Sequence, residues 1–277
     1  MVVFPNCKIN LGLHVVEKRQ DGFHNIETVF YPVKWCDALE VIENTSSTEQ
    51  FKFSQSGLSI DVVPEQNILY KTWKLVSEVA KFPNIQVHLH KNIPMGAGLG
   101  GGSANAAFFI NLLDSKFNLQ LPDSKKFFIA SQLGSDCSFF INNKPVFASG
   151  KGDEFQTISC DLSSYYILVV MPPVHSNTRE AYDGLTPVKP QKDLKDLVER
   201  LPVKDWKGLI KNDFELSIFK KYPSVKTLKE SLYENGAVYA SMSGSGSAVY
   251  GIFENNPEIR VPDDYRYFLQ MPDKKIL

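Results

Sequence analysis

The stretch that decides the fold reads Pro94-Met-Gly-Ala-Gly-Leu-Gly-Gly-Gly-Ser-Ala104. Glycine loses more conformational freedom on folding than any other residue, so such a run implies a ligand that approaches the bare backbone closely. A helix of small residues is expected to follow, from Ser103 to about Leu113. The first amides of a helix have no partner within it, and the helix dipole places partial positive charge there. The segment therefore predicts a cradle for a phosphate group.

Other interpretations of this segment carry less weight. Gly96-x-Gly98-x-x-Gly101 formally satisfies the dinucleotide-binding fingerprint, but no buried strand ending in an acidic residue follows the helix. A Walker loop needs Gly-Lys-Ser or Gly-Lys-Thr, and here Gly102 is followed directly by Ser103. A flexible connector is seldom followed at once by an alanine-rich helix that packs closely. The phosphate cradle is the favoured interpretation.

Length and composition define the broad class of the protein. The chain has 277 residues, of which 43% are hydrophobic, so it can bury a large core in one or two domains. Its net charge of −1 gives no overall attraction to nucleic acid or to an anionic membrane, and we expect neither as a partner. Four cysteines without a C-x-x-C pair argue against structural zinc and disulfides. The start of the sequence is unlike a signal peptide, and we expect a cytoplasmic protein.

Hydrophobic patterning predicts a mixture of strands and helices. Residues 9–15 alternate between apolar and polar or small side chains, which predicts a half-buried strand. Similar patterns predict strands near 26–33, 38–42, 50–53, 85–89, 165–171, 238–241 and 248–253. Helices are expected over 69–80 with Asn67 as N-cap, over 123–133 opened by Asp123 or Ser124, and within 192–234. A turn at 150–152 suggests a domain over residues 1–155 and a second over 156–277.

The glycine-rich segment resembles the central motif of the small-molecule kinases related to galactokinase, homoserine kinase, mevalonate kinase and phosphomevalonate kinase. That family also has an N-terminal strand motif and a late glycine-rich motif. Both occur here in the same order, as Lys8-Ile-Asn-Leu-Gly-Leu13 and Ser243-Gly-Ser-Gly-Ser247. The resemblance implies an α+β fold of two lobes, an N-terminal nucleotide-binding lobe and a C-terminal lobe of sheet and helices. It also implies ATP and Mg²⁺ as cofactors.

Further motifs narrow the resemblance to one branch of the family. Pro5-x-x-Lys8-Ile-Asn10 followed by Asp21-Gly-Phe-His24-x-Ile-x-Thr28 is similar to the kinases of a cytidine-diphosphate-linked methylerythritol in the non-mevalonate isoprenoid pathway. The resemblance implies that ATP phosphorylates the 2-hydroxyl of this substrate. The partners implied are ATP and a cytidyl diphosphate, with a monomer or weak homodimer as the assembly. Two alternatives stay open: a kinase of the same family for homoserine, mevalonate or a sugar, and a nucleotide-binding regulator without catalysis.

Asp136 and Lys8 are the candidate catalytic residues. Asp136 is followed by an otherwise apolar stretch, 137–141, where a carboxylate needs a cationic partner or takes up a proton. Lys8 lies on an otherwise apolar strand and has the same need. The resemblance implies that the two side chains meet at the acceptor hydroxyl, with Asp136 as the base and Lys8 keeping it ionised. A purely structural ion pair between them is the alternative.

The resemblance also implies the binding residues. On the ATP side they are Pro94, Met95, Gly96, Ala97, Gly98, Leu99, Gly100, Gly101, Gly102, Ser103, Ala104, Asn67 and Lys91. On the substrate side they are Asn10, Phe23, His24, Thr178 and Tyr182, of which Phe23 and Tyr182 would sandwich the cytosine while His24 bonds its edge. No dense His, Asp and Glu cluster predicts a dedicated metal site, so Mg²⁺ would be held largely by phosphates and water.

Some of these assignments have structural alternatives. Lys91 could be a solvated lysine at a strand end, Tyr182 a helix core residue, and His24 a surface histidine. The run 243–247 is expected near the phosphates, with a simple turn between strands as the alternative. Phe23 stands where the family commonly has tyrosine, which keeps the stacking face but removes a hydroxyl.

Overall fold

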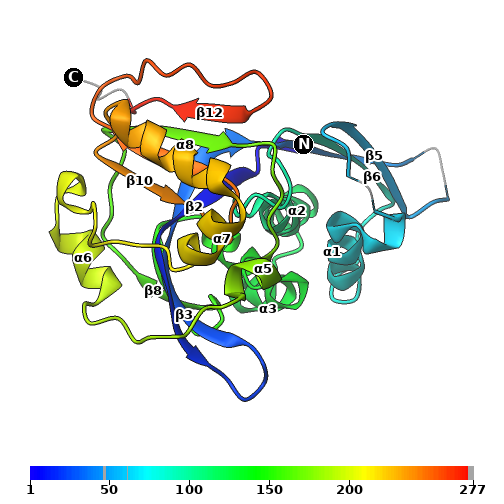
Figure 1. Cartoon of the computed structure of the whole chain (residues 1–277). Coiled ribbons are helices and arrows are strands. Elements are labelled where there is room, and N and C mark those ends of the chain that lie inside the picture. Colours follow the sequence, from blue (N-terminus) through cyan, green and yellow to red (C-terminus); the bar gives the residue numbers. More distant parts are fainter. Residues whose placement is uncertain (46–47, 61, 274–277) are drawn as a thin grey trace. The chain divides into compact units, whose positions relative to one another are not determined.

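The computed structural model describes residues 1–45, 48–60 and 62–273 (Figure 1). Runs of strands and runs of helices follow one another along the chain, which confirms the expected α+β fold class. The chain forms two compact units, each assembled from separate pieces of sequence. Unit 1 comprises 1–7, 34–95 and 100–144, and unit 2 comprises 8–33, 96–99 and 145–277. The division at 155/156 stays a prediction, and the last four residues of its second part lie outside the described residues.

Unit 1 consists of one sheet and a group of helices. The sheet has the order β1 (Val2–Val3), β4 (Ala38–Glu43), β6 (Ile85–Lys91), β5 (Phe51–Gly57). Only the β5–β6 pair is parallel among its described pairings. The helices are η1 (Pro64–Gln66), α1 (Ile68–Ser77), α2 (Gly101–Phe117), α3 (Asp123–Leu133) and α4 (Cys137–Asn142). Helix α2 is central to this group, because it contacts α1, α3 and α4 as well as β4.

Unit 2 contains two sheets, the first of which includes most of β2 and β3. One has the order β2 (Asn6–Lys18), β3 (His24–Cys36), β7 (Val146–Ser149), β8 (Glu154–Thr157). The other has the order β10 (Tyr239–Met242), β11 (Val249–Phe253), β9 (Tyr166–Met171), β12 (Arg266–Gln270). The helices are α5 (Thr178–Tyr182), α6 (Leu194–Arg200), η2 (Val203–Asp205), α7 (Glu215–Lys221) and α8 (Pro223–Glu234). Helix α8 covers β10 and β11, and their apolar side chains form a common core.

Strand β2 differs from the prediction of a half-buried strand. Every residue from Asn6 to Leu13 is buried. The polar positions of the alternating pattern do not face solvent, because Lys8 and Asn10 are held in a buried hydrogen-bond network. The prediction of half-burial was therefore wrong for this segment.

Two local features that position the site follow from the sequence. The Asn67 side chain accepts a hydrogen bond from the Leu69 amide at 2.9 Å, which confirms Asn67 as the N-cap of α1. Helix α3 begins at Asp123 as expected, although Pro122 occupies the N-cap position. None of the described helices has the length and apolar character that a membrane crossing requires.

Candidate functional site

The beginning of α2 in unit 1 has the geometry of an anion cradle. Gly100 is the N-cap, with a left-handed φ of 69°, and the first bond of the helix ladder runs from the Ala104 amide to the Gly100 carbonyl at 2.9 Å. The amides of Gly101, Gly102 and Ser103 therefore precede the hydrogen-bond ladder at the positive end of a 17-residue helix. These amides suit a phosphate group.

The two glycines that open α2 have different surroundings. A Cβ atom at Gly101 would lie 2.9 Å from Ile93 Cγ2 and 3.0 Å from Lys91 Nζ. A Cβ atom at Gly102 would meet none of the described atoms within 4 Å. Close packing inside the unit thus explains the glycine at position 101, whereas the backbone at position 102 is open to an approaching ligand.

Lys91 lies beneath this helix start and is fully buried. Its Nζ donates to Asp37 Oδ2 at 2.5 Å, and Asn105 Nδ2 donates to the same oxygen at 2.8 Å. Burial lowers the pKa of Lys91, and the neighbouring Asp37 carboxylate opposes this effect. The alternative of a solvated lysine was wrong, since the Lys91 side chain is only 1% exposed.

Asp37 is a site-supporting residue that the sequence analysis missed. Asp37 Oδ2 accepts hydrogen bonds from Lys91 and Asn105. Asp37 Oδ1 accepts hydrogen bonds from the backbone amides of Asn92 and Ile93 at 2.7 and 2.8 Å. One buried carboxylate thereby joins the end of β6 to the second turn of α2. The available signal was a single acidic residue in the apolar stretch 35–39.

Asp136 stands at the N-cap position of α4 and is half-buried. The next residue, Cys137, shares a side-chain hydrogen bond with Ser103. Burial raises the pKa of the Cys137 thiol to about 11, and the Asp136 charge acts in the same direction. Helices α2 and α4 pack against each other, so the candidate base and the anion cradle belong to the same part of unit 1.

In unit 2, Lys8 and Asn10 form a buried polar network on β2. Lys8 Nζ donates to Asn10 Oδ1 at 2.7 Å and lies 4.8 Å from the centre of the Phe30 ring. Asn10 Nδ2 donates to Thr28 Oγ1 at 2.9 Å, and the Tyr250 hydroxyl donates to the Asn10 carbonyl at 2.8 Å. Asn10 therefore orients the ammonium group of Lys8. Lys8 and Asp136 belong to different units, and their meeting at a hydroxyl stays a prediction.

The first half of the glycine-rich loop, 96–99, belongs to unit 2. The Ala97 carbonyl accepts a hydrogen bond from the Ala248 amide at 3.2 Å, and the Gly98 carbonyl accepts one from Ser243 Oγ at 2.9 Å. The Leu99 carbonyl accepts one from the Lys8 amide at 2.9 Å. The side chains of Ala97 and Leu99 are each 1% exposed. A Cβ atom at Gly98 would lie 1.9 Å from the Ser243 carbonyl oxygen, so only glycine fits there.

The late run 243–247 connects β10 to β11 and packs on two other segments of unit 2. Ser243 contacts Gly98, as above, and Ser247 Oγ donates to the Val174 carbonyl. Ser176 Oγ donates to the Ser245 carbonyl at 2.9 Å, and the hydroxyls of Thr178 and Ser245 are 3.3 Å apart. The run thus joins the glycine-rich loop to the candidate substrate residue Thr178.

The three aromatic residues proposed for cytosine lie in unit 2. The rings of His24 and Tyr182 are stacked, with centroids 4.3 Å apart and planes at 17°. Phe23 is 60% exposed, and Lys151 Nζ lies 5.2 Å from the centre of its ring. Burial, and then the charge of Lys18, lower the pKa of His24. Two rings at this spacing are in direct contact, so a base would reach this face of Tyr182 only when His24 moves aside.

The comparisons with known proteins agree on one family. The N-terminal domain model of the GHMP kinases matches residues 67–144, and the C-terminal model matches residues 193–263. The 4-diphosphocytidyl-2-C-methyl-D-erythritol kinase of Bacteroides fragilis is 47% identical over 263 residues, which cover 95% of this chain and 96% of the relative. The enzyme of that name from Azobacteroides pseudotrichonymphae is 48% identical, and the match covers 92% of this chain and 94% of that enzyme.

Solved structures show the same likeness. A crystal structure of 4-(cytidine 5'-diphospho)-2C-methyl-D-erythritol kinase has a TM-score of 0.77 at 27% identity, covering 91% of this chain and 90% of that one. Homoserine kinase from Cytophaga hutchinsonii has a TM-score of 0.60 at 14% identity, and the match covers 89% of this chain and 84% of that one. The second likeness shows the fold alone.

Proposed function

This chain belongs to the 4-diphosphocytidyl-2-C-methyl-D-erythritol kinases of the GHMP kinase family, and on that basis we propose that it transfers the γ-phosphoryl group of ATP to the 2-hydroxyl of this cytidyl substrate. The product would serve non-mevalonate isoprenoid synthesis. ATP use follows from membership of a kinase family.

The observation that carries the proposal is the packing of α2 against α4 in unit 1. It places a helix start that suits phosphate and the helix whose N-cap is Asp136 in the same unit. Phosphoryl transfer needs a positioned phosphate, neutralisation of its charge, and a group that receives the hydroxyl proton. The first and the last of these requirements have candidates in the same unit.

We assign the chemical step to Asp136 and Lys8. The Asp136 carboxylate accepts the proton of the 2-hydroxyl while that oxygen forms a bond to the γ-phosphorus, and the bond from the γ-phosphorus to the β–γ bridging oxygen breaks. ADP leaves with the bonding electron pair. The Lys8 ammonium, oriented by Asn10, stabilises the negative charge of the base and of the reacting oxygen.

Mg²⁺ is expected to be bound mainly by the phosphates of ATP. Among the described residues, no group of three or more His, Cys, Asp and Glu side chains could hold a metal ion. Mg²⁺ commonly keeps several waters and binds through one or two protein ligands plus substrate phosphates, which suits a helix start that offers the Ser103 hydroxyl. When bound, the ion would neutralise phosphate charge.

On the substrate side, we assign cytosine recognition to Phe23, His24 and Tyr182. The stacked His24 ring would leave the face of Tyr182 when cytosine enters, and its neutral imidazole would then hydrogen-bond the edge of the base. Thr178 and Asn10 would contact the remainder of the substrate. Asn67, which caps α1, and Lys91, which supports the start of α2, would act on the ATP side.

The protein is further proposed to work in the cytoplasm as a monomer or weak homodimer, without nucleic acid. A net charge of −1 gives no overall attraction to nucleic acid, which supports the last part of this proposal.

The experiment that tests the function is mass spectrometry of the full chain incubated with ATP, Mg²⁺ and the cytidyl substrate. We expect the substrate to gain one phosphate group, while homoserine and mevalonate in parallel reactions gain none at a comparable rate. A reaction in which only homoserine or mevalonate is phosphorylated would overturn the substrate assignment. A single-turnover reaction with no phosphate transfer to any acceptor would indicate a regulator instead.

A further inference from the structure

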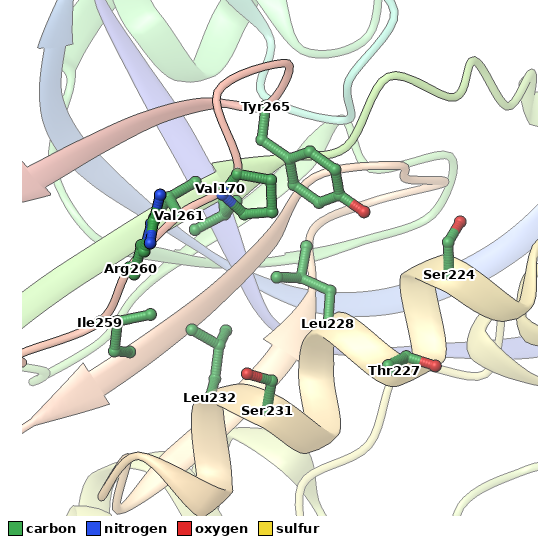
Figure 2. Close-up of a pocket in the computed structure, with 11 residues that line it drawn as sticks. Val170, Ser224, Thr227, Leu228, Ser231, Leu232, Ile259, Arg260, Val261 and Tyr265 are labelled. Carbon is green, nitrogen blue, oxygen red and sulfur yellow. The ribbon is translucent and has the colours of Figure 1, made fainter.

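A cavity of about 390 Å³ lies in unit 2 between α8 and the segment that follows β11 (Figure 2). None of its lining residues belongs to the proposed kinase site. Pockets for small ligands span roughly 300–1,000 Å³, so this cavity suits a ligand at the small end of that range.

One wall of the cavity is apolar and belongs to the core of the unit. Leu228 and Leu232 are four residues apart on α8 and therefore share one face of the helix, and Val170 of β9 lies behind them (Figure 2). Leu232 and Val170 are at most 1% exposed, and Val261 packs against the same core. Because these residues are fixed by packing, the wall exists before any ligand arrives.

Polar groups occur on both sides of the lining. Arg260 is the one charged residue among the described lining residues, and it lies beside Ile259 (Figure 2). Ser224, Thr227 and Ser231 lie along α8, and the Tyr265 hydroxyl points toward Ser224 (Figure 2). A single cation beside a wall of apolar side chains matches a molecule with an anionic head and a short apolar body.

The charge of Arg260 selects the head group. Its planar guanidinium matches the geometry of a carboxylate or a phosphate and can bind either with two parallel hydrogen bonds. Glu258 and Asp263 flank the segment in sequence but do not line the cavity. A ligand with a cationic head would meet Arg260 without a compensating carboxylate in the lining.

We propose that this cavity is a binding site for a small amphiphilic anion, with the head group on Arg260 and the apolar body against Leu228, Leu232 and Val170. The site is separate from the kinase chemistry, and the proposal does not depend on the substrate assigned above.

The test uses the full chain, isotopically labelled and observed by NMR, and sodium octanoate as the probe. We expect saturable shifts in the signals of Leu228, Leu232 and Val261. Arg260→Gln should weaken octanoate binding about tenfold, which corresponds to loss of one charge-assisted contact of about 1.4 kcal/mol. Arg200→Gln on α6, which removes the same charge outside this lining, should leave binding unchanged.

Two further arms separate this site from general adhesion to apolar surface. Ser231→Phe places a ring in the cavity and should abolish octanoate binding, while an unchanged melting temperature confirms the fold. Octylammonium should bind at least tenfold more weakly than octanoate, because its cationic head cannot form the charge-assisted contact with Arg260. Absence of saturable shifts, undiminished binding by the Arg260→Gln or Ser231→Phe variant, or equal binding of octylammonium would each overturn the proposal.

Discussion

Lys91 and Asp37 form a buried ion pair beneath the start of α2, with Nζ 2.5 Å from Oδ2 and both side chains at most 1% exposed. Asp37 also accepts hydrogen bonds from two backbone amides and from Asn105. Four donors on one carboxylate fix the path of the chain from β6 into the glycine-rich loop.

Asp37→Asn should destabilise the protein strongly, because it leaves the Lys91 ammonium buried without a counter-charge. Breaking a buried pair by removing one partner typically costs about 3–5 kcal/mol. We expect the free energy of unfolding, measured by urea denaturation, to fall by about 3 kcal/mol. Lys226→Gln is the control, because it breaks an exposed ion pair with Glu230, in which the two side chains are 58% and 57% exposed. This variant should change the free energy of unfolding by less than about 1 kcal/mol. Equal losses in the two variants would contradict this account.

Gly102→Ala should separate ligand binding from folding. A methyl group there meets no atom of the described part of the chain within 4 Å, and alanine favours a helix over glycine by up to about 1 kcal/mol, so the melting temperature should hold or rise. If a phosphate approaches this backbone, calorimetry should show ATP binding weakened about tenfold, or by roughly 1.4 kcal/mol. Gly101→Ala is the matched control and should lower the melting temperature, because its methyl meets Ile93 at 2.9 Å. Unchanged ATP affinity in Gly102→Ala would place the phosphate elsewhere.

Asp136→Asn should fold normally and lose most of its turnover. Loss of a general base typically reduces the rate about 10² to 10⁴-fold. The expected result is a fall in kcat of that size with a wild-type urea midpoint. An unchanged kcat would leave Asp136 with a structural role only.

His24→Ala should raise KM for the cytidyl substrate far more than for ATP. The loss of one neutral hydrogen bond and a stacking surface predicts an increase of about tenfold. His88→Ala is a suitable control, since His88 lies on β6 of unit 1 and bonds the hydroxyls of Ser54 and Ser56. Equal effects of His24→Ala on both KM values would argue against a role in cytosine binding.

The pH dependence of the substrate KM should follow the lowered pKa of His24. The folded-state pKa lies below the ordinary value of 6.5, because of burial first and the charge of Lys18 second, so the imidazole is neutral above 6.5. The stability that neutral His24 contributes is therefore present above that value and is lost as the pH falls through the folded pKa. Lys18→Gln should raise the pKa of His24 in an NMR titration and move the acid rise in KM to higher pH. A pKa that is unchanged in this variant would exclude Lys18 as a cause.

Much of the fold could be predicted from the sequence where an element is long or has recognisable capping residues at its ends. The boundary residues Asp123 or Ser124 and Gly134 predict a helix over 123–133, and the structure has α3 there. Asn67 was identified as a cap from residue type alone. Helix α4, with six residues, and strand β8, with four, were missed because such short elements carry little periodic signal.

The candidate site was predictable in its motifs but not in its supporting contacts. The glycine-rich segment predicts an anion cradle because bare amides at a helix start suit an anion. Asp37 was missed because its partners are far from it in sequence: Asn105 lies 68 positions away. The burial of β2 was underestimated because a polar residue in an alternating strand ordinarily faces water, and here Lys8 and Asn10 bond each other inside the protein.

The tethered carbonyls at 97–99 have a consequence for the kinetics of nucleotide capture. A loop that these hydrogen bonds already fix loses little conformational entropy when a nucleotide binds. Capture of the triphosphate should then proceed in a single kinetic phase, with an observed rate that rises linearly with ATP concentration and reaches no plateau set by a slow rearrangement of this segment.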